Sequence, residues 1–235
     1  YLADSASNTI RNVTTNKNYH GLELSATSAN CEFYEITANN NTAYGVFLNG
    51  ADQATIVNAT ANNNNNGIGF IWSDESTAQN INASKNTQYG IRIYDSDLVN
   101  LTDVVVKNNQ QGIRNEYPTN CAFVNITAQD NEYGAYFRQN AYYNVLLNST
   151  ISNNSLAGVY FNIYSGNQPQ NNTIYNNYFN NSVNLVLEEG IAGPNWLNTS
   201  LTTATNIIDG VNTGGNYGSQ PDGLGFSQLC NDTKP

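Results

Sequence analysis

The stretch Tyr89-Gly90-Ile91-Arg92-Ile93 decides the fold of this chain, because variants of it return every 22 to 26 residues. Each variant places a glycine before a short alternation of apolar and other side chains. Six further copies begin at His20, Tyr44, Asn66, Gln111, Tyr133 and Ala157. A degenerate copy without the glycine begins at Val183. A fixed period of this length predicts stacked repeats, in which each unit buries its apolar face only against its neighbours.

Two kinds of strand are expected in every repeat. After the glycine, pairs such as Ile68 and Phe70 are expected to point inward, and an alternation of period two is typical of a strand. A second β-rich stretch, such as residues 55–60, precedes each glycine, and no helical periodicity intervenes. The expected outward positions after the glycine are Glu23, Phe47, Gly69, Arg92, Arg114, Tyr136 and Tyr160.

These features predict an all-β fold, a right-handed parallel β-helix of about eight coils over residues 1–190. At about 4.8 Å per coil, the rod would be roughly 40 Å long. Residues 191–235 lose the repeat, and they are expected to form a loop-rich C-terminal cap in which Trp196, Ile207 and Ile208 close the core.

An asparagine recurs beside the repeats at intervals of 22 to 24 residues. Asparagine tolerates a left-handed backbone and bonds to local peptide groups, which suits a turn. Identical amides on successive coils can also bond to one another. We therefore expect a structural ladder without a binding role, formed by Asn16, Asn40, Asn63, Asn86, Asn109, Asn131, Asn154 and Asn177.

The charge balance restricts the partners of the chain. Of its 235 residues 11% are charged, and the net charge is −10. Nucleic acids and anionic membrane surfaces would be repelled, so neither is an expected partner. No run of about 18 apolar residues occurs, so no membrane span is expected. The chain begins at Tyr1 and contains no methionine, which favours a trimmed, exported protein outside the cell or at its surface.

Asn-x-Ser/Thr triplets are frequent, and they favour a glycosylated exported protein. An asparagine-rich repeat also produces such triplets by chance, which is the alternative explanation. The candidate acceptors are Asn12, Asn40, Asn58, Asn82, Asn100, Asn125, Asn148, Asn153, Asn171, Asn180, Asn198 and Asn231.

Three cysteines are present. Cys31 and Cys121 hold equivalent places four coils apart, about 19 Å at the usual strand spacing, which is too far for a disulfide. We expect both to be small buried residues of the coil wall. Cys230 lies near the C-terminus, and a partner for it would lie beyond Pro235.

The glycine motif and the tail of the chain both resemble known sequences. The coils resemble the parallel β-helix repeats of the NosD-type and carbohydrate-binding/sugar-hydrolase superfamily. The tail resembles the end of such domains in archaeal, especially methanogen, cell-surface proteins, although that pattern has Trp where this chain has Gly218. The matching tail motifs are Asn195-Trp196, Asn198-Thr199, Asn206-Ile207-Ile208, Gly214-Gly215-Asn216-Tyr217, Gly223-Leu224-Gly225-Phe226-Ser227 and Cys230-Asn231-Asp232.

The sequence contains few side chains that bind transition metals. Copper and zinc sites need His, Met or paired Cys, and His20 is the only histidine, so the copper role linked to NosD-type proteins is not expected here. We therefore expect no metal ligands and no cofactor. Calcium at Asp95-Ser96-Asp97 or Asp74-Glu75 is an alternative, although surface turns are rich in Asp without binding a metal.

One predicted face gathers charged and aromatic side chains, with Asp95, Asp97 and Glu116 on the same side. Arginines grip carboxylates, acids transfer protons and aromatic rings stack on sugars, so this face suits an anionic polysaccharide. The simpler alternative is that these arginines only pair with neighbouring acids and stack on tyrosines. The candidate carbohydrate-binding residues are Trp72, Arg92, Tyr94, Arg114, Tyr117, Tyr136, Arg138 and Tyr160, and no catalytic residue is assigned.

Asn115 breaks the pattern of the repeat, because it takes an inward position that other coils fill with Leu, Ile or Phe. An unpaired buried amide is costly. We therefore expect the coil at Asn115-Glu116-Tyr117-Pro118 to be irregular.

The predicted function is structural: a module of a surface layer, sheath or filament that joins to itself or to other envelope proteins by stacking β-helices end to end. On this interpretation the chain is not an enzyme. The alternative is a β-helix that binds a polysaccharide on one face, or cleaves it as a lyase, hydrolase or epimerase. Fold alone does not separate these functions.

Overall fold

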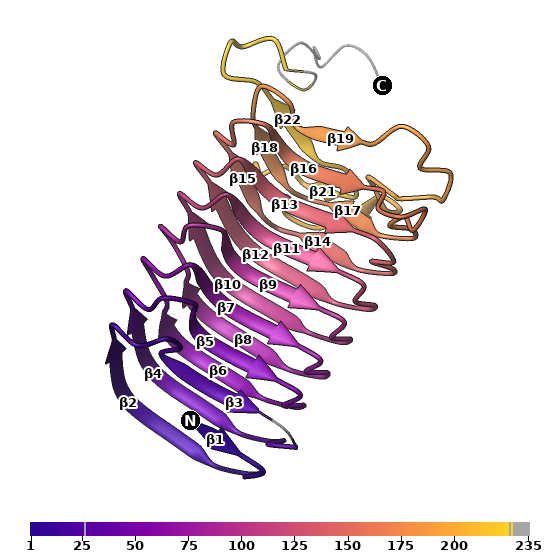
Figure 1. The fold of residues 1–235 in the computed structure, drawn as a ribbon. Coiled ribbons are helices and arrows are strands. Elements are labelled where there is room, and N and C mark those ends of the chain that lie inside the picture. The colour runs from indigo at the N-terminus through magenta and orange to yellow at the C-terminus, as the bar shows by residue number, and fades with distance from the viewer. Residues whose placement is uncertain (26, 226, 228–235) are drawn as a thin grey trace.

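The computed structural model describes residues 1–25, 27–225 and 227, and this part of the chain forms a rod of stacked coils (Figure 1). The strands advance from β1 and β2 at one end of the rod to β19 and β22 at the other. The predicted all-β parallel solenoid of about eight turns is confirmed. No helix in the described ranges has the length and hydropathy of a membrane span.

One sheet carries the repeat glycines and is called the glycine sheet below. Its strand pairs are parallel, and each strand pairs with its equivalents one coil earlier and one coil later. Ile91, for example, is in register with Ile68 and Ile113. The strands, in order, are β1 (Leu2–Ala3), β3 (Leu22–Ser25), β5 (Tyr44–Asn49), β7 (Asn66–Ile71), β9 (Tyr89–Tyr94), β11 (Gln111–Glu116), β13 (Tyr133–Arg138), β16 (Ala157–Asn162) and β19 (Leu185–Leu187).

A second parallel sheet is called the kinked sheet, because its strands bend at a residue with positive φ, such as Asn58 (57°) or Asn125 (55°). Asn adopts this conformation at low cost, so it serves as a corner of the coil. The strands are β2 (Thr9–Asn16), β4 (Glu32–Asn39), β6 (Thr55–Thr60), β8 (Thr77–Asn82), β10 (Asn100–Lys107), β12 (Ala122–Gln129), β14 (Val145–Leu147), β15 (Thr150–Ser152), β17 (Thr173–Tyr175), β18 (Tyr178–Asn180) and β22 (Tyr217–Ser219). A short antiparallel pair, β20 (Thr202–Thr203) and β21 (Asn212–Thr213), lies outside both sheets.

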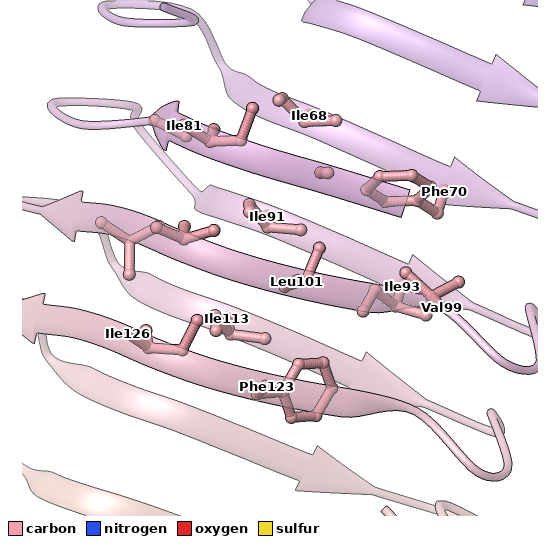
Figure 2. Packing of buried hydrophobic residues seen from close by; sticks show 14 of the residues in the cluster. Ile68, Phe70, Ile81, Ile91, Ile93, Val99, Leu101, Ile113, Phe123 and Ile126 are labelled. Atoms are coloured by element: carbon pink, nitrogen blue, oxygen red, sulfur yellow. The ribbon is translucent and has the colours of Figure 1, made fainter. Parts of the chain in front are cut away.

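The hydrophobic core lies between the two sheets. Ile91 and Ile93 of the glycine sheet lie close to Leu101 of the kinked sheet, and the same layering repeats in the next coils (Figure 2). All three side chains are fully buried. Each buried aliphatic side chain of this kind contributes about 1.5–3 kcal/mol. The alternation after the glycine therefore predicted the inward positions correctly.

The repeat glycines are needed for close packing between coils. A Cβ atom at Gly90 would lie 2.6 Å from the carbonyl oxygen of Gly112 on the next coil and 2.8 Å from Val106 Cγ1. Both distances are far shorter than van der Waals contact. Glycine stands here because the coils approach too closely for any side chain, and not because the backbone needs a positive φ.

A buried asparagine ladder runs through the coils, and it differs in part from the predicted one. Each backbone N–H donates to the amide oxygen of the asparagine one coil later, as in Asn86 N to Asn109 Oδ1 (2.8 Å) and Asn109 N to Asn131 Oδ1 (2.9 Å). The predicted members Asn86, Asn109, Asn131 and Asn154 belong to it. Its other members include Asn41, Asn64 and Asn181.

The other four predicted members of the ladder were wrong. Asn40 and Asn63 are exposed turn residues with positive φ, one position before the true members. Asn16 is exposed, and its amide oxygen accepts the N–H of Asn39 on the outer surface. Asn177 belongs to a separate stack, in which its amide oxygen accepts the N–H of Ser149 (2.9 Å). In runs of consecutive asparagines the spacing alone did not identify the inward residue.

The coil at Asn115 is regular, contrary to the expectation. Strand β11 keeps its register through this residue, because Asn115 pairs with Ile93 on one side and Phe137 on the other. Asn115 is fully buried, and neither polar atom of its amide has a hydrogen-bond partner among the described residues. The neighbouring coils hold the backbone in place even though the side chain is unsatisfied.

The tail does not plug the core as predicted. Trp196 is 54% exposed and Ile208 is 47% exposed, so neither closes the end of the solenoid. The tail instead continues the stacking: Asn172 N donates to Asn195 Oδ1 (3.2 Å), and β22 pairs with β18. Its backbone groups therefore satisfy those of the last coils.

The cysteine predictions are confirmed where the structure describes them. Cys31 and Cys121 are free and almost completely buried. Burial raises the pKa of the Cys121 thiol to about 12. Cys230 and the glycosylation candidate Asn231 lie outside the described residues.

Candidate functional site

The outer face of the glycine sheet presents columns of side chains that run along the rod. Parallel pairing in register stacks equivalent residues of successive coils, so each column is one position of the repeat. The column two residues after the repeat glycine consists of Phe47, Gly69, Arg92, Arg114, Tyr136 and Tyr160. The next outward column, four residues after the glycine, consists of Asn49, Ile71, Tyr94, Glu116, Arg138 and Asn162.

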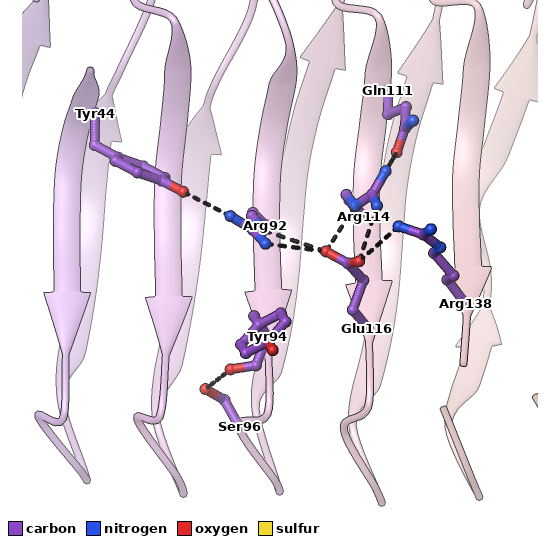
Figure 3. A network of polar contacts seen from close by, with 8 residues as sticks. All are labelled: Tyr44, Arg92, Tyr94, Ser96, Gln111, Arg114, Glu116 and Arg138. Atoms are coloured by element: carbon purple, nitrogen blue, oxygen red, sulfur yellow. Dashed lines mark hydrogen bonds and ion pairs between the residues drawn. The ribbon is translucent and has the colours of Figure 1, made fainter. Parts of the chain in front are cut away.

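Three arginines converge on one carboxylate at the centre of this face (Figure 3). Arg92 Nη2 lies 3.2 Å from Glu116 Oε2, and Arg138 Nη1 lies 3.2 Å from Glu116 Oε1. Arg114 contacts both oxygens, with Nε 2.7 Å from Oε2 and Nη2 2.8 Å from Oε1. The Glu116 side chain is 4% exposed. We call these four residues the arginine cluster.

The ionisation states of the arginine cluster follow from these contacts. Burial alone would raise the pKa of the Glu116 carboxyl, but the hydrogen bond from Arg114 and the charges of the three arginines lower it below its ordinary value of 4.5. Burial lowers the pKa of Arg114, whereas its bond to Glu116 raises it, and the net result lies above the ordinary value. The Glu116 carboxyl is therefore ionised and the Arg114 guanidinium protonated at neutral pH.

Tyrosines surround the arginine cluster. The Arg138 guanidinium lies 3.8 Å from the ring centre of Tyr164, and those of Arg92 and Arg114 lie 5.1 Å from Tyr94 and 5.4 Å from Tyr136. Rings at these distances attract the cations. Burial raises the pKa of Tyr136 to about 12, so its hydroxyl stays protonated at neutral pH.

A groove of about 440 Å³ opens beside the arginine cluster. Arg92 lies at one side, and the other lining residues are Tyr44, Phe47, Asn49, Ile71, Trp72 and Tyr94. Tyr44 reaches across strand β7 to place its hydroxyl 3.4 Å from Arg92 Nη1 (Figure 3). Gly69 permits this, because a Cβ there would lie 2.6 Å from Tyr44 Cε1.

Two aromatic residues at the edge of this face have an unusual backbone. Trp72 has φ of 50° and is 55% exposed, and Tyr117 has φ of 67°. A bulky residue in this region costs roughly 1–2 kcal/mol relative to glycine, which the preceding coil has at the same place, Gly50. Tyr94 lies between the two, with its ring centre 6.0 Å from that of Trp72 and 5.5 Å from that of Tyr117. Asp95 (47°) and Gln139 (56°) also have positive φ at this turn position, so the conformation belongs to the corner of each coil.

The structure brings the predicted carbohydrate-binding residues together on one surface. The three arginines meet at Glu116, Trp72, Tyr94 and Tyr117 form the aromatic row, and Tyr136 and Tyr160 stack with ring centres 5.0 Å apart. Asp95 and Asp97 were expected on the same side, but the Asp97 carboxylate instead accepts the backbone N–H of Thr119 (2.7 Å) in the turn.

Tyr44, Tyr89 and Gln111 also belong to this face, and the sequence reasoning missed them. Each directly precedes a repeat glycine. Counting the alternation backward through the glycine would place these residues inside, but the alternation breaks there. A Cβ at Gly90 would meet the buried Val106, so Gly90 and Ile91 both face inward, and Tyr89 lies outside against Arg92 and Arg114. The sequence pattern that could have identified them is the tyrosine, glutamine or asparagine that recurs directly before the glycine.

The carboxylates named as calcium candidates lie in the turns between coils, where at least two of them accept backbone N–H groups. The Asp74 carboxylate accepts the backbone N–H of Asp97 (2.8 Å), so it supports the turn in the same way as Asp97. In the part of the chain that the structure describes, no group of three or more His, Cys, Asp or Glu side chains could hold a metal ion. Calcium at these turns remains a prediction.

The glycosylation candidates remain predictions, and the structure shows where they lie. Asn12, Asn58 and Asn125 occupy exposed corners of the kinked sheet with positive φ. These corners lie on the second sheet, whereas the arginine cluster lies on the glycine sheet. Glycans there would leave the outer face of the glycine sheet open.

The chain matches a protein family over most of its length. The family described as periplasmic copper-binding protein (NosD) matches residues 1–80 and 58–223. No curated protein sequence matches the chain.

Solved structures share the fold at low sequence identity. The A-module of mannuronan C-5 epimerase AlgE6 from Azotobacter vinelandii has a TM-score of 0.63 at 15% identity, over 76% of this chain and 62% of that module. Pectate lyase Pel9A has a TM-score of 0.56 at 14% identity, over 75% of this chain and 56% of the lyase. The chain thus spans less than two thirds of the length of either protein.

Both of these neighbours are enzymes. The prediction that the chain is not an enzyme is therefore wrong, because the solved folds that it resembles are those of an epimerase and a lyase. Likeness at 14–15% identity establishes the shared fold and assigns no reaction to this chain.

Proposed function

The chain belongs to the NosD family of periplasmic proteins, and from this premise we propose that it is an exported protein that binds a polysaccharide on the outer face of its glycine sheet, as the docking step of an enzymatic reaction. The observation that carries the proposal is the groove beside Arg92, walled by Trp72 and Tyr94. Exposed aromatic rings and hydrogen-bonding side chains together suit the faces and edges of sugar rings.

The residues of this chain do not fit the copper ion in the family description. The ring of His20 packs on Phe47 with centres 4.7 Å apart, and its Nδ1 accepts the N–H of Tyr44. Both described cysteines are buried, and the sequence contains no methionine. Copper sites need several accessible nitrogen or sulfur ligands at one place, so no step of the proposed function involves copper.

A structural envelope module, the other function considered, has less support. Its arguments were the low charge, the stacked amides and the resemblance of the tail to archaeal surface proteins, which remains a prediction. The neighbouring folds are instead those of enzymes named for polysaccharides. Membership of a periplasmic family supports export for either function.

The proposal is tested with the two tryptophans of the chain. Trp72 borders the groove, whereas Trp196 is equally exposed but pairs with Thr173 of the kinked sheet. Purified protein is titrated with a panel of soluble polysaccharides by calorimetry, and products are followed by sugar analysis and NMR. We expect W72A to lower affinity about tenfold, roughly 1.4 kcal/mol, and W196A to leave it unchanged. Absence of binding across the panel, or equal effects of both substitutions, would contradict the proposal.

A further inference from the structure

We infer that the polysaccharide is acidic, and that Arg92 and Arg138 bind its acidic groups while Arg114 and Glu116 hold those two arginines in place. This inference rests on the proposed function and specifies its substrate class.

The arginine cluster carries more positive charge than its own carboxylate neutralises. Three guanidinium groups share one glutamate, which leaves a local excess of two positive charges in a chain of net charge −10. Burial and the charge of Arg92 both act to lower the pKa of Arg114, although its contacts to Glu116 keep that pKa above the ordinary value. An anionic group placed on this face would relieve the repulsion between these cations, and a neutral sugar would not.

The three arginines differ in what they leave open to a ligand. Arg114 is 10% exposed, and its contacts to Glu116 are joined by a bond from Nη1 to Gln111 Oε1 (3.1 Å). Arg92 and Arg138 are 29% and 19% exposed, and each meets Glu116 at 3.2 Å. The middle arginine is therefore committed to the protein. The outer two are the more exposed. Arg92 donates to Glu116 through Nε and Nη2 and to Tyr44 through Nη1, and Arg138 donates to Glu116 through Nη1. The remaining N–H groups of these guanidinium groups suit a carboxylate or a sulfate.

The arrangement also gives the sugar chain a direction. Arg92 lies on β9 and Arg138 on β13, two coils apart, which is about 9.6 Å along the rod. The aromatic row from Trp72 through Tyr94 to Tyr117 follows the same axis. A linear polyanion that crosses the strands would thus meet both outer arginines, with its rings beside the aromatic row.

The test compares charged and uncharged forms of the same polymers. Polygalacturonate is paired with its methyl-esterified form, and dextran sulfate with dextran, so that carboxylate and sulfate sources are distinguished. The variants are R92Q and R138Q, with R11Q as the matched control. Arg11 lies on the kinked sheet with its guanidinium 3.9 Å from the ring centre of Tyr34, so R11Q removes the same charge from an arginine that also packs on a tyrosine but lies away from the arginine cluster.

We expect the wild-type chain to bind at least one charged polymer and to bind its uncharged partner about tenfold more weakly. R92Q and R138Q should each lose roughly tenfold in affinity for the charged form, R11Q should lose nothing, and added salt should weaken binding. Binding of dextran sulfate alone would support the inference with sulfate as the acidic group.

Two results would overturn it. Equal affinity for the charged and uncharged forms, with W72A still lowering affinity about tenfold, would leave the proposed function standing and refute the acidic substrate. Equal losses in R11Q and R92Q would show a general charge effect. Failure of every polymer, charged or neutral, to bind would refute the proposed function itself.

Discussion

Replacement of Asn115 by leucine is expected to stabilise the protein, although it alters the centre of the rod. Asn and Leu have the same branching at Cγ, so N115L exchanges two polar atoms for two methyl groups of similar shape. Both polar atoms of Asn115 are buried without a hydrogen-bond partner among the described residues. The equivalent inward positions of two earlier coils are Leu24 and Leu48, which are fully buried.

The magnitude follows from the cost of an unsatisfied buried amide. Mutational data place that cost at about 1–3 kcal/mol, so we expect N115L to raise the free energy of unfolding by about 2 kcal/mol. For a chain of this size that corresponds to an increase in melting temperature of about 4–8 °C. Urea unfolding followed by circular dichroism gives the free energy, and an unchanged m-value shows that the extent of unfolding is the same.

The matched control is a buried asparagine that is fully bonded. Asn109 accepts the N–H of Asn86 (2.8 Å) and donates to Ala83 O (3.2 Å) and Asn131 Oδ1 (3.1 Å). N109L breaks these bonds and leaves backbone groups unpaired, so it should destabilise the protein by about 3 kcal/mol. If N115L lowers the free energy of unfolding, or if both substitutions act in the same direction, the reasoning from unsatisfied polar atoms is refuted.

Three further predictions concern the arginine cluster, the groove and a thiol. E116Q removes the counter-ion of three arginines and should lower the free energy of unfolding by about 3 kcal/mol at pH 7, measured by urea unfolding. The pKa of Glu116 is lowered in the folded state, so the contribution of its charge to the free energy of unfolding is complete above about pH 4.5 and is lost as the pH falls through the folded-state pKa. The difference in free energy of unfolding between wild type and E116Q should therefore shrink below about pH 4.5. A constant difference would contradict this. G69A should displace the Tyr44 ring and weaken polysaccharide binding several-fold in calorimetry with the fold retained in circular dichroism, and unchanged affinity would argue against a role for Tyr44. Cys121 should resist iodoacetamide at pH 8 in the native state and react after unfolding, as followed by mass spectrometry, because burial raises its pKa to about 12; rapid native labelling would show that the wall opens.

The fold could be predicted from the sequence because one local rule repeats. A glycine followed by alternating apolar residues defines a strand, and its regular return defines the stack, so few other arrangements could bury Ile68 and Phe70 together. The arginines could be placed on one face for the same reason. Because the strands pair in strict parallel register, equivalent residues of successive coils lie at the same place on the sheet.

The rest depended on contacts that no periodicity encodes. Spacing could not separate Asn40 from Asn41, since only the three-dimensional turn shows which amide faces the core. Glu116 was one of several acids on the predicted face, and its central role depends on where three long side chains converge. Tyr44 was missed because its ring crosses a whole coil above Gly69, a contact between residues far apart in sequence.

The buried asparagine ladder also makes the two ends of the rod chemically different. Its backbone N–H groups all donate toward the later coil, from Asn41 to Asn64 and onward to Asn154 and Asn181. At the later end the chain itself closes the ladder, because Asn184 Oδ1 accepts the N–H of Asn181 (2.8 Å) and the Asn184 amide donates to Ser219 O (2.7 Å). At the earlier end the ladder starts with Asn18, whose N–H donates to Asn41 Oδ1 (3.0 Å). The ladder thus has a direction, and any coil inserted into the rod must keep the same order of donor and acceptor.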